Sequence, residues 1–95
     1  MTEAFVYILR CVDGSYYTGI TRASPERRLA EHNAGGFGGY TASRRPVDLV
    51  YSCAFGRIVE AIAAERQIKG WSRAKKEALI RGDLDALPAL ARRRS

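Results

Sequence analysis

One glutamate lies on a helix face that the sequence predicts to be apolar, and it is the residue that points most directly to chemistry. Apolar residues recur at Ile58, Ala61, Ile62 and Ile68, a spacing typical of a helix with one buried stripe. At about 100° per residue, Glu65 lies within about 20° of Ile58, near the middle of that stripe. An unpaired carboxylate in apolar surroundings is costly, so we expect Glu65 to have an arginine or a bound cation as its partner. A structural ion pair is the simpler interpretation, because such pairs hold carboxylates in many proteins without a function.

Four further side chains could surround a phosphate group together with Glu65. Tyr7 and Tyr17 lie in two β-like segments, and Arg28 and His32 are spaced i, i+4, which places them on one helix face. His32 is the only histidine, so nucleases that need two or more histidines are excluded. Each residue alone has a simpler interpretation, since strand tyrosines usually belong to a core and an Arg-His pair to a solvated surface. As a set, the five residues predict one concave polar surface.

Two short β segments must position the tyrosines. Residues 5–11 are almost continuously apolar, and residues 16–21 resume β character after an interruption at Asp13-Gly14. This pattern predicts a hairpin.

The length of the hairpin loop decides whether the two tyrosines share a face of the sheet. A two-residue loop places Tyr7 and Tyr17 on opposite faces, because side chains alternate along a strand. A three-residue loop with Gly14 in the left-handed conformation pairs Leu9 with Tyr17 and Tyr7 with Gly19. We favour this second register, because both tyrosines then share a face and Gly19 leaves room beside the Tyr7 ring.

A helix is predicted directly after the hairpin. Ser24 is a suitable N-cap and Pro25 suits the first helical position, so the helix starts there and runs to about Asn33. On this helix Arg27 and Glu31 are expected to form an ordinary surface ion pair, separate from Arg28 and His32.

The rest of the chain is predicted to hold a loop, a strand and two helices. Residues 34–46 contain four glycines and two aromatic residues, which indicates a loop, and residues 47–55 form the third strand. A helix over residues 57–69 ends at Gly70, and another covers about residues 73–81. In this last helix we expect an inward apolar face and an outward basic face, made of Ala74, Ala78 and Leu79 and of Lys75 and Lys76 respectively.

Length and composition exclude several classes of protein. Ninety-five residues suffice for one compact domain, and no apolar run approaches the ~20 residues of a membrane-spanning helix. The N-terminus lacks the features of a signal peptide, and Cys11 and Cys53 lie in apolar β-like runs where reduced, buried thiols are expected. We therefore expect a cytoplasmic protein. A net charge of +6 and a pI near 9.8 indicate a polyanionic partner, with nucleic acid the leading candidate.

The ordered set of short motifs resembles the GIY-YIG nuclease family. Phe5-Val6-Tyr7 stands where that family has Gly-Ile-Tyr, and Tyr17-Thr18-Gly19 stands where it has Tyr-Ile-Gly. Arg28 matches the family's helix arginine, His32 the His or Tyr one turn later, and Glu65 its metal-binding glutamate.

The resemblance covers roughly residues 4–82 and is closest to small stand-alone bacterial GIY-YIG proteins. The nuclease domain of eukaryotic structure-specific endonuclease subunits is similar in the same places. The shared short motifs are Tyr7-Ile8-Leu9, Asp13-Gly14-Ser15, Tyr40-Thr41, Arg45-Pro46 and Ile68-Lys69-Gly70-Trp71. The chain departs from the wider family at Phe5, which replaces the first glycine, and in lacking the Asn that some members carry near the C-terminus.

The resemblance implies an α/β fold, a three-stranded antiparallel sheet flanked by helices, and a Mg²⁺-dependent DNA endonuclease suited to DNA repair or recombination. Glu65 would hold the Mg²⁺, and Tyr7 or Tyr17, with a phenol pKa lowered by nearby cations, would take a proton from the attacking water. Arg28 would stabilise charge on the phosphate, and His32 would orient or assist.

Domain limits and partners complete the expectations. Residues 1–83 would form the nuclease domain and residues 84–95 a basic C-terminal tail. DNA would contact a basic surface made of Arg44, Arg45, Lys69, Lys75 and Lys76, and a partner protein could present the substrate. The alternative is a non-catalytic nucleic-acid-binding module that uses the same basic face.

Overall fold

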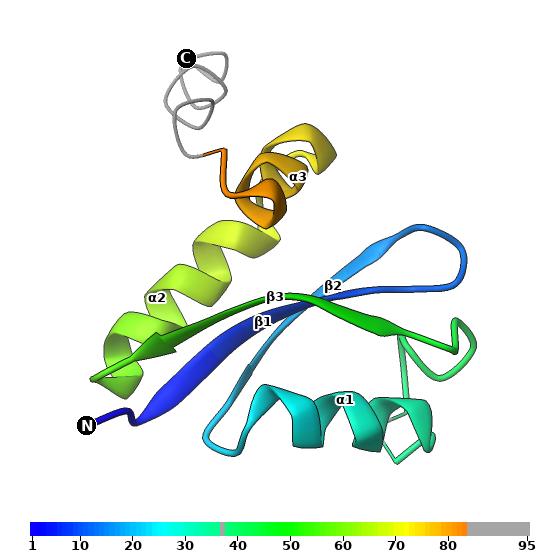
Figure 1. The fold of residues 1–95 in the computed structure, drawn as a ribbon, viewed down its shortest axis with the longest axis horizontal. Helices are drawn as coiled ribbons and strands as arrows, with labels where there is room; N and C mark the ends of the chain where they lie inside the picture. Colours follow the sequence, from blue (N-terminus) through cyan, green and yellow to red (C-terminus); the bar gives the residue numbers. More distant parts are fainter. Residues whose placement is uncertain (37, 84–95) are drawn as a thin grey trace.

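A computed structural model describes residues 1–36 and 38–83, in which a three-stranded antiparallel sheet has helices on both faces (Figure 1). This architecture confirms the predicted fold class. The predicted basic tail, residues 84–95, lies outside the described residues. In chain order the elements are β1 (Ala4–Arg10), β2 (Tyr16–Thr21), α1 (Pro25–Asn33), β3 (Asp48–Phe55), α2 (Ile58–Lys69) and α3 (Arg73–Arg81).

The hairpin of β1 and β2 adopts the register with the three-residue loop. Tyr7 pairs with Gly19 and Leu9 with Tyr17, and Gly14 has a φ of 85°, the left-handed conformation that the turn requires. The favoured register is therefore confirmed. The central strand of the sheet is β1, because β3 pairs antiparallel with its other edge and the strand order is β2-β1-β3.

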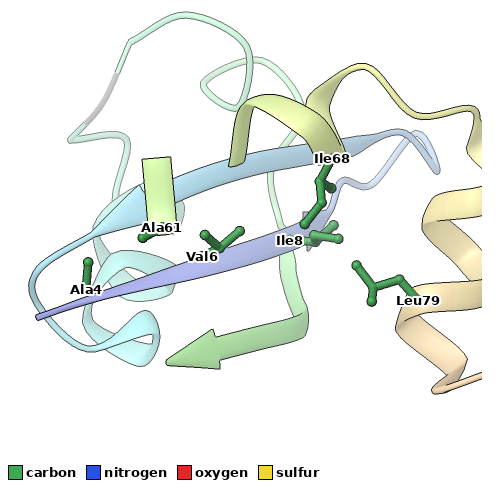
Figure 2. Close-up of a cluster of buried hydrophobic side chains, with 6 residues drawn as sticks. All are labelled: Ala4, Val6, Ile8, Ala61, Ile68 and Leu79. Carbon is green, nitrogen blue, oxygen red and sulfur yellow. The ribbon is translucent and has the colours of Figure 1, made fainter. Parts of the chain in front are cut away.

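Alternation along β1 gives the sheet two different faces. Val6 and Ile8 point toward α2 and α3, where they form an apolar core with Ala61, Ile68 and Leu79 (Figure 2). The intervening residues point to the opposite face, which α1 covers (Figure 1). That second cluster contains Tyr7, Leu9, Cys11 and Val47, with Tyr17, Leu29 and Leu49 packed against it. One strand thus serves a largely apolar core on one side and carries a tyrosine that faces a polar pocket on the other.

Both ends of α1 are fixed by side-chain hydrogen bonds. The Ser24 hydroxyl accepts a hydrogen bond from the Arg27 amide at 3.1 Å, as expected of an N-cap. At the other end, the amide group of Asn33 accepts from the Val47 N–H at 2.7 Å and donates to the Val47 carbonyl at 3.0 Å. The hydrogen bonds between Asn33 and Val47 therefore join the two ends of the loop between α1 and β3, which holds the loop close to the sheet.

The apolar face of α2 differs from the predicted stripe. Ile62 is 39% exposed, whereas Ala61 and Ile68 are buried. The prediction that Ile62 points inward was wrong. The sheet contacts a stripe that includes Ala61, and the next residue along a helix is rotated from it by about 100°.

The two faces of α3 also differ from the prediction. Lys75 is 5% exposed, together with the buried Ala78 and Leu79, while Ala74 is exposed. The expected orientations of Lys75 and Ala74 were therefore wrong, because positions 75, 78 and 79 share one side of the helix. The ammonium group of Lys75 lies 4.2 Å from the centroid of the Trp71 ring, a cation–π contact that helps to offset its burial.

Two further sequence expectations can be compared with the structure. Cys11 and Cys53 are both free thiols, and Cys11 is buried as expected while Cys53 is only half-buried. None of the helices in the described part of the chain has the length and apolar character that crossing a bilayer requires.

Candidate active site

A pocket of about 530 Å³ opens on the α1 face of the sheet. Four of the five predicted site residues line it: Tyr7, Tyr17, Arg28 and His32. The hairpin register brings the two tyrosines together, with ring centroids 6.4 Å apart, and α1 supplies the arginine and the histidine. Glu65 is not among the residues that line this pocket. The loop after α1 contributes residues that sequence reasoning did not assign to the site, chiefly Tyr40 and Thr41.

A chain of hydrogen bonds joins β1, α1 and the following loop at the base of the pocket. The Tyr7 hydroxyl lies 3.1 Å from Nε2 of His32, and Nδ1 of the same ring lies 2.8 Å from the Thr41 hydroxyl. All three side chains are buried. Both ring nitrogens of His32 are therefore engaged, which fixes the orientation of the imidazole.

Burial is the largest cause of the pKa shifts of His32 and Tyr7 in this chain of hydrogen bonds. It lowers the pKa of His32, and the nearby Arg28 lowers it further against the opposing effect of Glu31, so the imidazole is neutral at pH 7. Burial also raises the pKa of Tyr7 to about 12, with Tyr17, Glu31 and Glu65 raising it and Arg28 lowering it. The expected lowering of the phenol pKa is thus wrong for Tyr7 in this structure, because desolvation outweighs the one nearby cation.

Arg28 is held at the pocket by two neighbours. Its Nε donates to the Thr21 hydroxyl at 2.8 Å, and its NH1 group donates to Glu31 at 2.9 Å. Glu31 also pairs with Arg27 at 3.2 Å. The expected surface ion pair of Arg27 and Glu31 is confirmed, but it is not separate from Arg28, because one turn of helix brings Glu31 within reach of both guanidinium groups. Glu31 and Thr21 fix the position of a cation suited to a phosphate.

Gly19 makes the close approach of the two tyrosines possible. A Cβ atom at this position would lie 2.6 Å from the Tyr7 hydroxyl oxygen and 3.0 Å from the Tyr17 ring. Any larger residue would displace both rings, so the predicted need for space beside Tyr7 is confirmed.

Tyr40 and Arg44 connect the loop to the pocket and to the hairpin. The Tyr40 ring stacks on Tyr17 with centroids 6.3 Å apart, and the Arg44 guanidinium lies 3.9 Å from the Tyr40 ring centroid. Arg44 also forms an ion pair with Asp13 in the hairpin loop at 3.1 Å. These contacts place Thr41 at the base of the pocket. The motif Tyr40-Thr41 was visible in the sequence, but only as part of the family resemblance.

Glu65 has a cation as its partner, and that cation is Lys69. Its carboxylate lies 2.8 Å from the Lys69 ammonium group, with exposed side-chain fractions of 13% for Glu65 and 54% for Lys69. Among the described residues there is no group of three or more His, Cys, Asp or Glu residues that could hold a metal ion. A single mostly buried carboxylate still fits Mg²⁺, which commonly binds one or two carboxylates, several waters and substrate phosphates.

The predicted DNA-binding residues differ in how far they are free to reach a ligand. Lys69 is exposed but paired with Glu65, and Arg45 is exposed while donating to the backbone oxygens of Ala42 and Asn33. Lys76 is half-buried, and this desolvation lowers its pKa. Lys75 is buried, so its side chain is the one least suited to contact DNA.

Comparison with known proteins agrees with this geometry. Residues 3–78 match the GIY-YIG catalytic domain. The UPF0213 protein of Halobacterium salinarum is 50% identical over 75 residues, which cover 79% of this chain and 96% of the relative. The UPF0213 protein of Staphylococcus haemolyticus is 46% identical over 80 residues, covering 84% of this chain and 96% of the relative.

Two structures solved by solution NMR are similar to this one. The UPF0213 protein of Bacillus halodurans is 44% identical, with a TM-score of 0.53 and coverage of 81% of each chain. A protein of E. faecalis is 40% identical, with a TM-score of 0.57 and coverage of 86% of this chain and 90% of the other.

Proposed function

The chain belongs to the GIY-YIG catalytic-domain family, and on this basis we propose that it is a Mg²⁺-dependent endonuclease that hydrolyses phosphodiester bonds in DNA. The observation that carries the proposal is the convergence of Tyr7, Tyr17, Arg28 and His32 on one pocket. Within one pocket, a tyrosine can serve as the general base, a fixed guanidinium can stabilise charge on the phosphate, and a histidine can orient or assist.

Tyr7 is the proposed general base. Its hydroxyl is the one that contacts His32, at 3.1 Å, and it also lines the pocket. In this role Tyr7 reacts as the phenolate: its own proton is first released to water, and the phenolate oxygen then takes the proton of the attacking water. Arg28, fixed by Thr21 and Glu31, stabilises the negative charge that gathers on the phosphate oxygens.

Glu65 is the proposed metal ligand, with substrate phosphate and water completing the coordination shell. A Mg²⁺ held by Glu65 would supply Lewis-acid chemistry, polarisation of the phosphate and stabilisation of charge on the leaving oxygen. The carboxylate of Glu65 contributes to raising the pKa of Tyr7, so a positive charge next to this carboxylate would favour the phenolate. Lys69 must then leave the carboxylate, and its exposed side chain is able to turn toward solvent or toward DNA.

DNA binding is proposed to rest on backbone phosphates. Arg45 is exposed and fixed by two backbone oxygens, and Lys69 and Lys76 add positive charge on α2 and α3. Arg44 donates hydrogen bonds to Asp13 and to the Tyr40 carbonyl. Its main proposed role is therefore to support the loop, and contact with a DNA phosphate is its secondary role. Such contacts position the duplex and carry no base sequence information.

The direct test is incubation of the purified chain with plain, nicked and branched DNA, with Mg²⁺ or with a chelator. We expect Mg²⁺-dependent cleavage and binding that weakens steeply with salt. Salt-sensitive binding without cleavage of any of these substrates would contradict the enzyme and support a binding module.

A further inference from the structure

Lys69, the last residue of α2, is bound to the carboxylate that the proposed metal needs. Its ammonium group lies 2.8 Å from Oε2 of Glu65, four residues earlier on the same helix. The exposed side-chain fraction is 13% for Glu65 and 54% for Lys69. The carboxylate is therefore mostly shielded from water, whereas the ammonium group is carried by a side chain that can move into solvent.

This ion pair lies within electrostatic range of both tyrosines of the pocket. Burial is the largest cause of the raised pKa of Tyr7, and the negative charge of Glu65 adds to it. The hydrogen bond to Glu65 is the largest cause of the raised pKa of Lys69, and Tyr17 adds to it. A change in the cation that accompanies Glu65 therefore reaches the pocket.

One carboxylate cannot balance the charge of both cations. Glu65 carries a single negative charge, which Lys69 alone balances, and Mg²⁺ would bring two positive charges to the same group. Like charges repel strongly where water is largely excluded. The described residues include no cluster of three or more His, Cys, Asp or Glu side chains that could share a metal ion. The ammonium group of Lys69 and a Mg²⁺ ion therefore compete for Glu65.

We propose that Lys69 is a built-in competitor of the metal, whose ammonium group holds Glu65 in the metal-free protein and moves to a DNA phosphate when Mg²⁺ takes its place. This inference rests on the proposed function and adds a regulation of the same site. Because Lys69 binds either the carboxylate or a phosphate, Mg²⁺ binding strengthens DNA binding. By thermodynamic linkage, DNA that engages Lys69 strengthens Mg²⁺ binding by the same factor.

The first test measures Mg²⁺ affinity and needs no cleavage. Lys69→Met removes the charge and keeps an unbranched side chain that suits a helix. Mg²⁺ is titrated into the full chain without DNA, at about 0.15 M salt, and binding is followed by NMR of the backbone amides of α2. We expect Lys69→Met to bind Mg²⁺ about three- to fivefold more tightly than the wild type, since the half-exposed ion pair that is lost is weak. An affinity equal to or below that of the wild type would overturn the proposal.

Arg66→Met is the matched control for net charge. Arg66 is exposed on the same helix, and the ion pair of Glu65 is made by Lys69. The control variant also removes one positive charge, but salt screens exposed charges that are not in contact, so its Mg²⁺ affinity should stay close to that of the wild type. If Arg66→Met raised the affinity as much as Lys69→Met, the effect would be one of net charge and the competition would be wrong.

The second test releases Lys69 in the absence of metal. Glu65→Gln removes the carboxylate, so with a chelator present the slope of log DNA affinity against log salt should steepen by about 0.9, the contribution of one phosphate contact. Adding Lys69→Met to this variant should return the slope to the wild-type value. Glu60→Gln also removes one negative charge from α2 and should leave the slope unchanged. A Glu65→Gln slope equal to that of the wild type would overturn the movement of Lys69 to DNA.

Failure of the competition and failure of the proposed function give different results. Tighter Mg²⁺ binding by Lys69→Met, in a protein that cuts none of the DNA substrates, would support the competition and contradict the endonuclease. Mg²⁺-dependent cleavage by the wild type, with no gain in Mg²⁺ affinity from Lys69→Met, would support the endonuclease and overturn the competition.

Discussion

The two faces of the sheet use the same central strand for opposite purposes. On the face covered by α2 and α3, Val6 and Ile8 pack among apolar side chains (Figure 2). On the face covered by α1, Tyr7 lies between them in sequence and hydrogen-bonds to a buried histidine. The first face depends on volume and shape, whereas the second depends on whether each polar atom has a partner. Substitutions on the two faces should therefore fail in different ways.

Glu65 is the residue that could break this division, because it lies on α2, the helix of the apolar face, yet is proposed to serve the polar pocket. Glu65→Gln should abolish Mg²⁺-dependent cleavage, since an amide is a far poorer Mg²⁺ ligand, while folding and DNA binding are retained. Cleavage is measured with a branched DNA substrate. Glu60→Gln, an exposed position on the same helix, is the control and should cut normally.

The structural alternative for Glu65 gives a different result. The Lys69 side chain is more than half exposed, so loss of the ion pair alone should cost less than about 1 kcal/mol. Equal cleavage by wild type and Glu65→Gln, with Mg²⁺ still required, would remove Glu65 from the proposed site.

A large deletion on the apolar face should reduce stability and leave the chemistry intact. Ile8 is fully buried in the core between β1 and α2, so Ile8→Ala should lower the free energy of unfolding by about 2–5 kcal/mol. Urea unfolding measures this loss. In the protein that remains folded, cleavage per molecule should match the wild type. A selective loss of cleavage would show that the two faces are not independent.

Tyr7→Phe should test the polar face through the pH dependence of the free energy of unfolding. The pKa of Tyr7 is raised from 10.0 to about 12 in the folded protein, so the folded state holds its phenol proton more tightly than the unfolded chain. This stabilisation is fully present below pH 10 and is lost as the pH rises from 10 to about 12. A shift of this size corresponds to about 2 to 3 kcal/mol.

The phenylalanine variant lacks this titration. We therefore expect the wild type to lose more stability than Tyr7→Phe between about pH 9 and about pH 12, measured as the difference in urea midpoint. Tyr51 has a similarly raised pKa, but it is present in both proteins and does not affect the difference. Parallel pH profiles for the two proteins would contradict the burial of a protonated Tyr7.

The smallest expected effect lies outside both faces of the sheet, in the loop between α1 and β3. Arg45→Ala should weaken DNA binding and reduce the slope of log affinity against log salt by about 0.9, the contribution of one phosphate contact to duplex DNA. Fluorescence anisotropy at several salt concentrations measures it. An unchanged slope would mean that Arg45 only caps the end of α1, where it donates to the Asn33 carbonyl.

The sequence alone determined the elements and the hairpin register. Ser24 and Pro25 mark the start of α1, Gly14 selects the three-residue loop, and Gly19 makes room for Tyr7, all of which are local effects. Since side chains alternate along a strand, the register placed Tyr7 and Tyr17 on one face before any tertiary contact was known. Arg28 and His32 followed from helix spacing.

Only the tertiary structure decided how these elements turn toward one another. The rotation of α2 exposes Ile62, and that of α3 buries Lys75 against Trp71, although periodicity allowed either orientation. Thr41 reaches His32 because a loop with no periodic pattern is fixed at the sheet by hydrogen bonds from distant residues. Desolvation of Tyr7 likewise depends on all the elements around it. Local signals specify a residue's conformation, but burial and polar partners are set by residues that are remote in sequence, and these decide the protonation of the site.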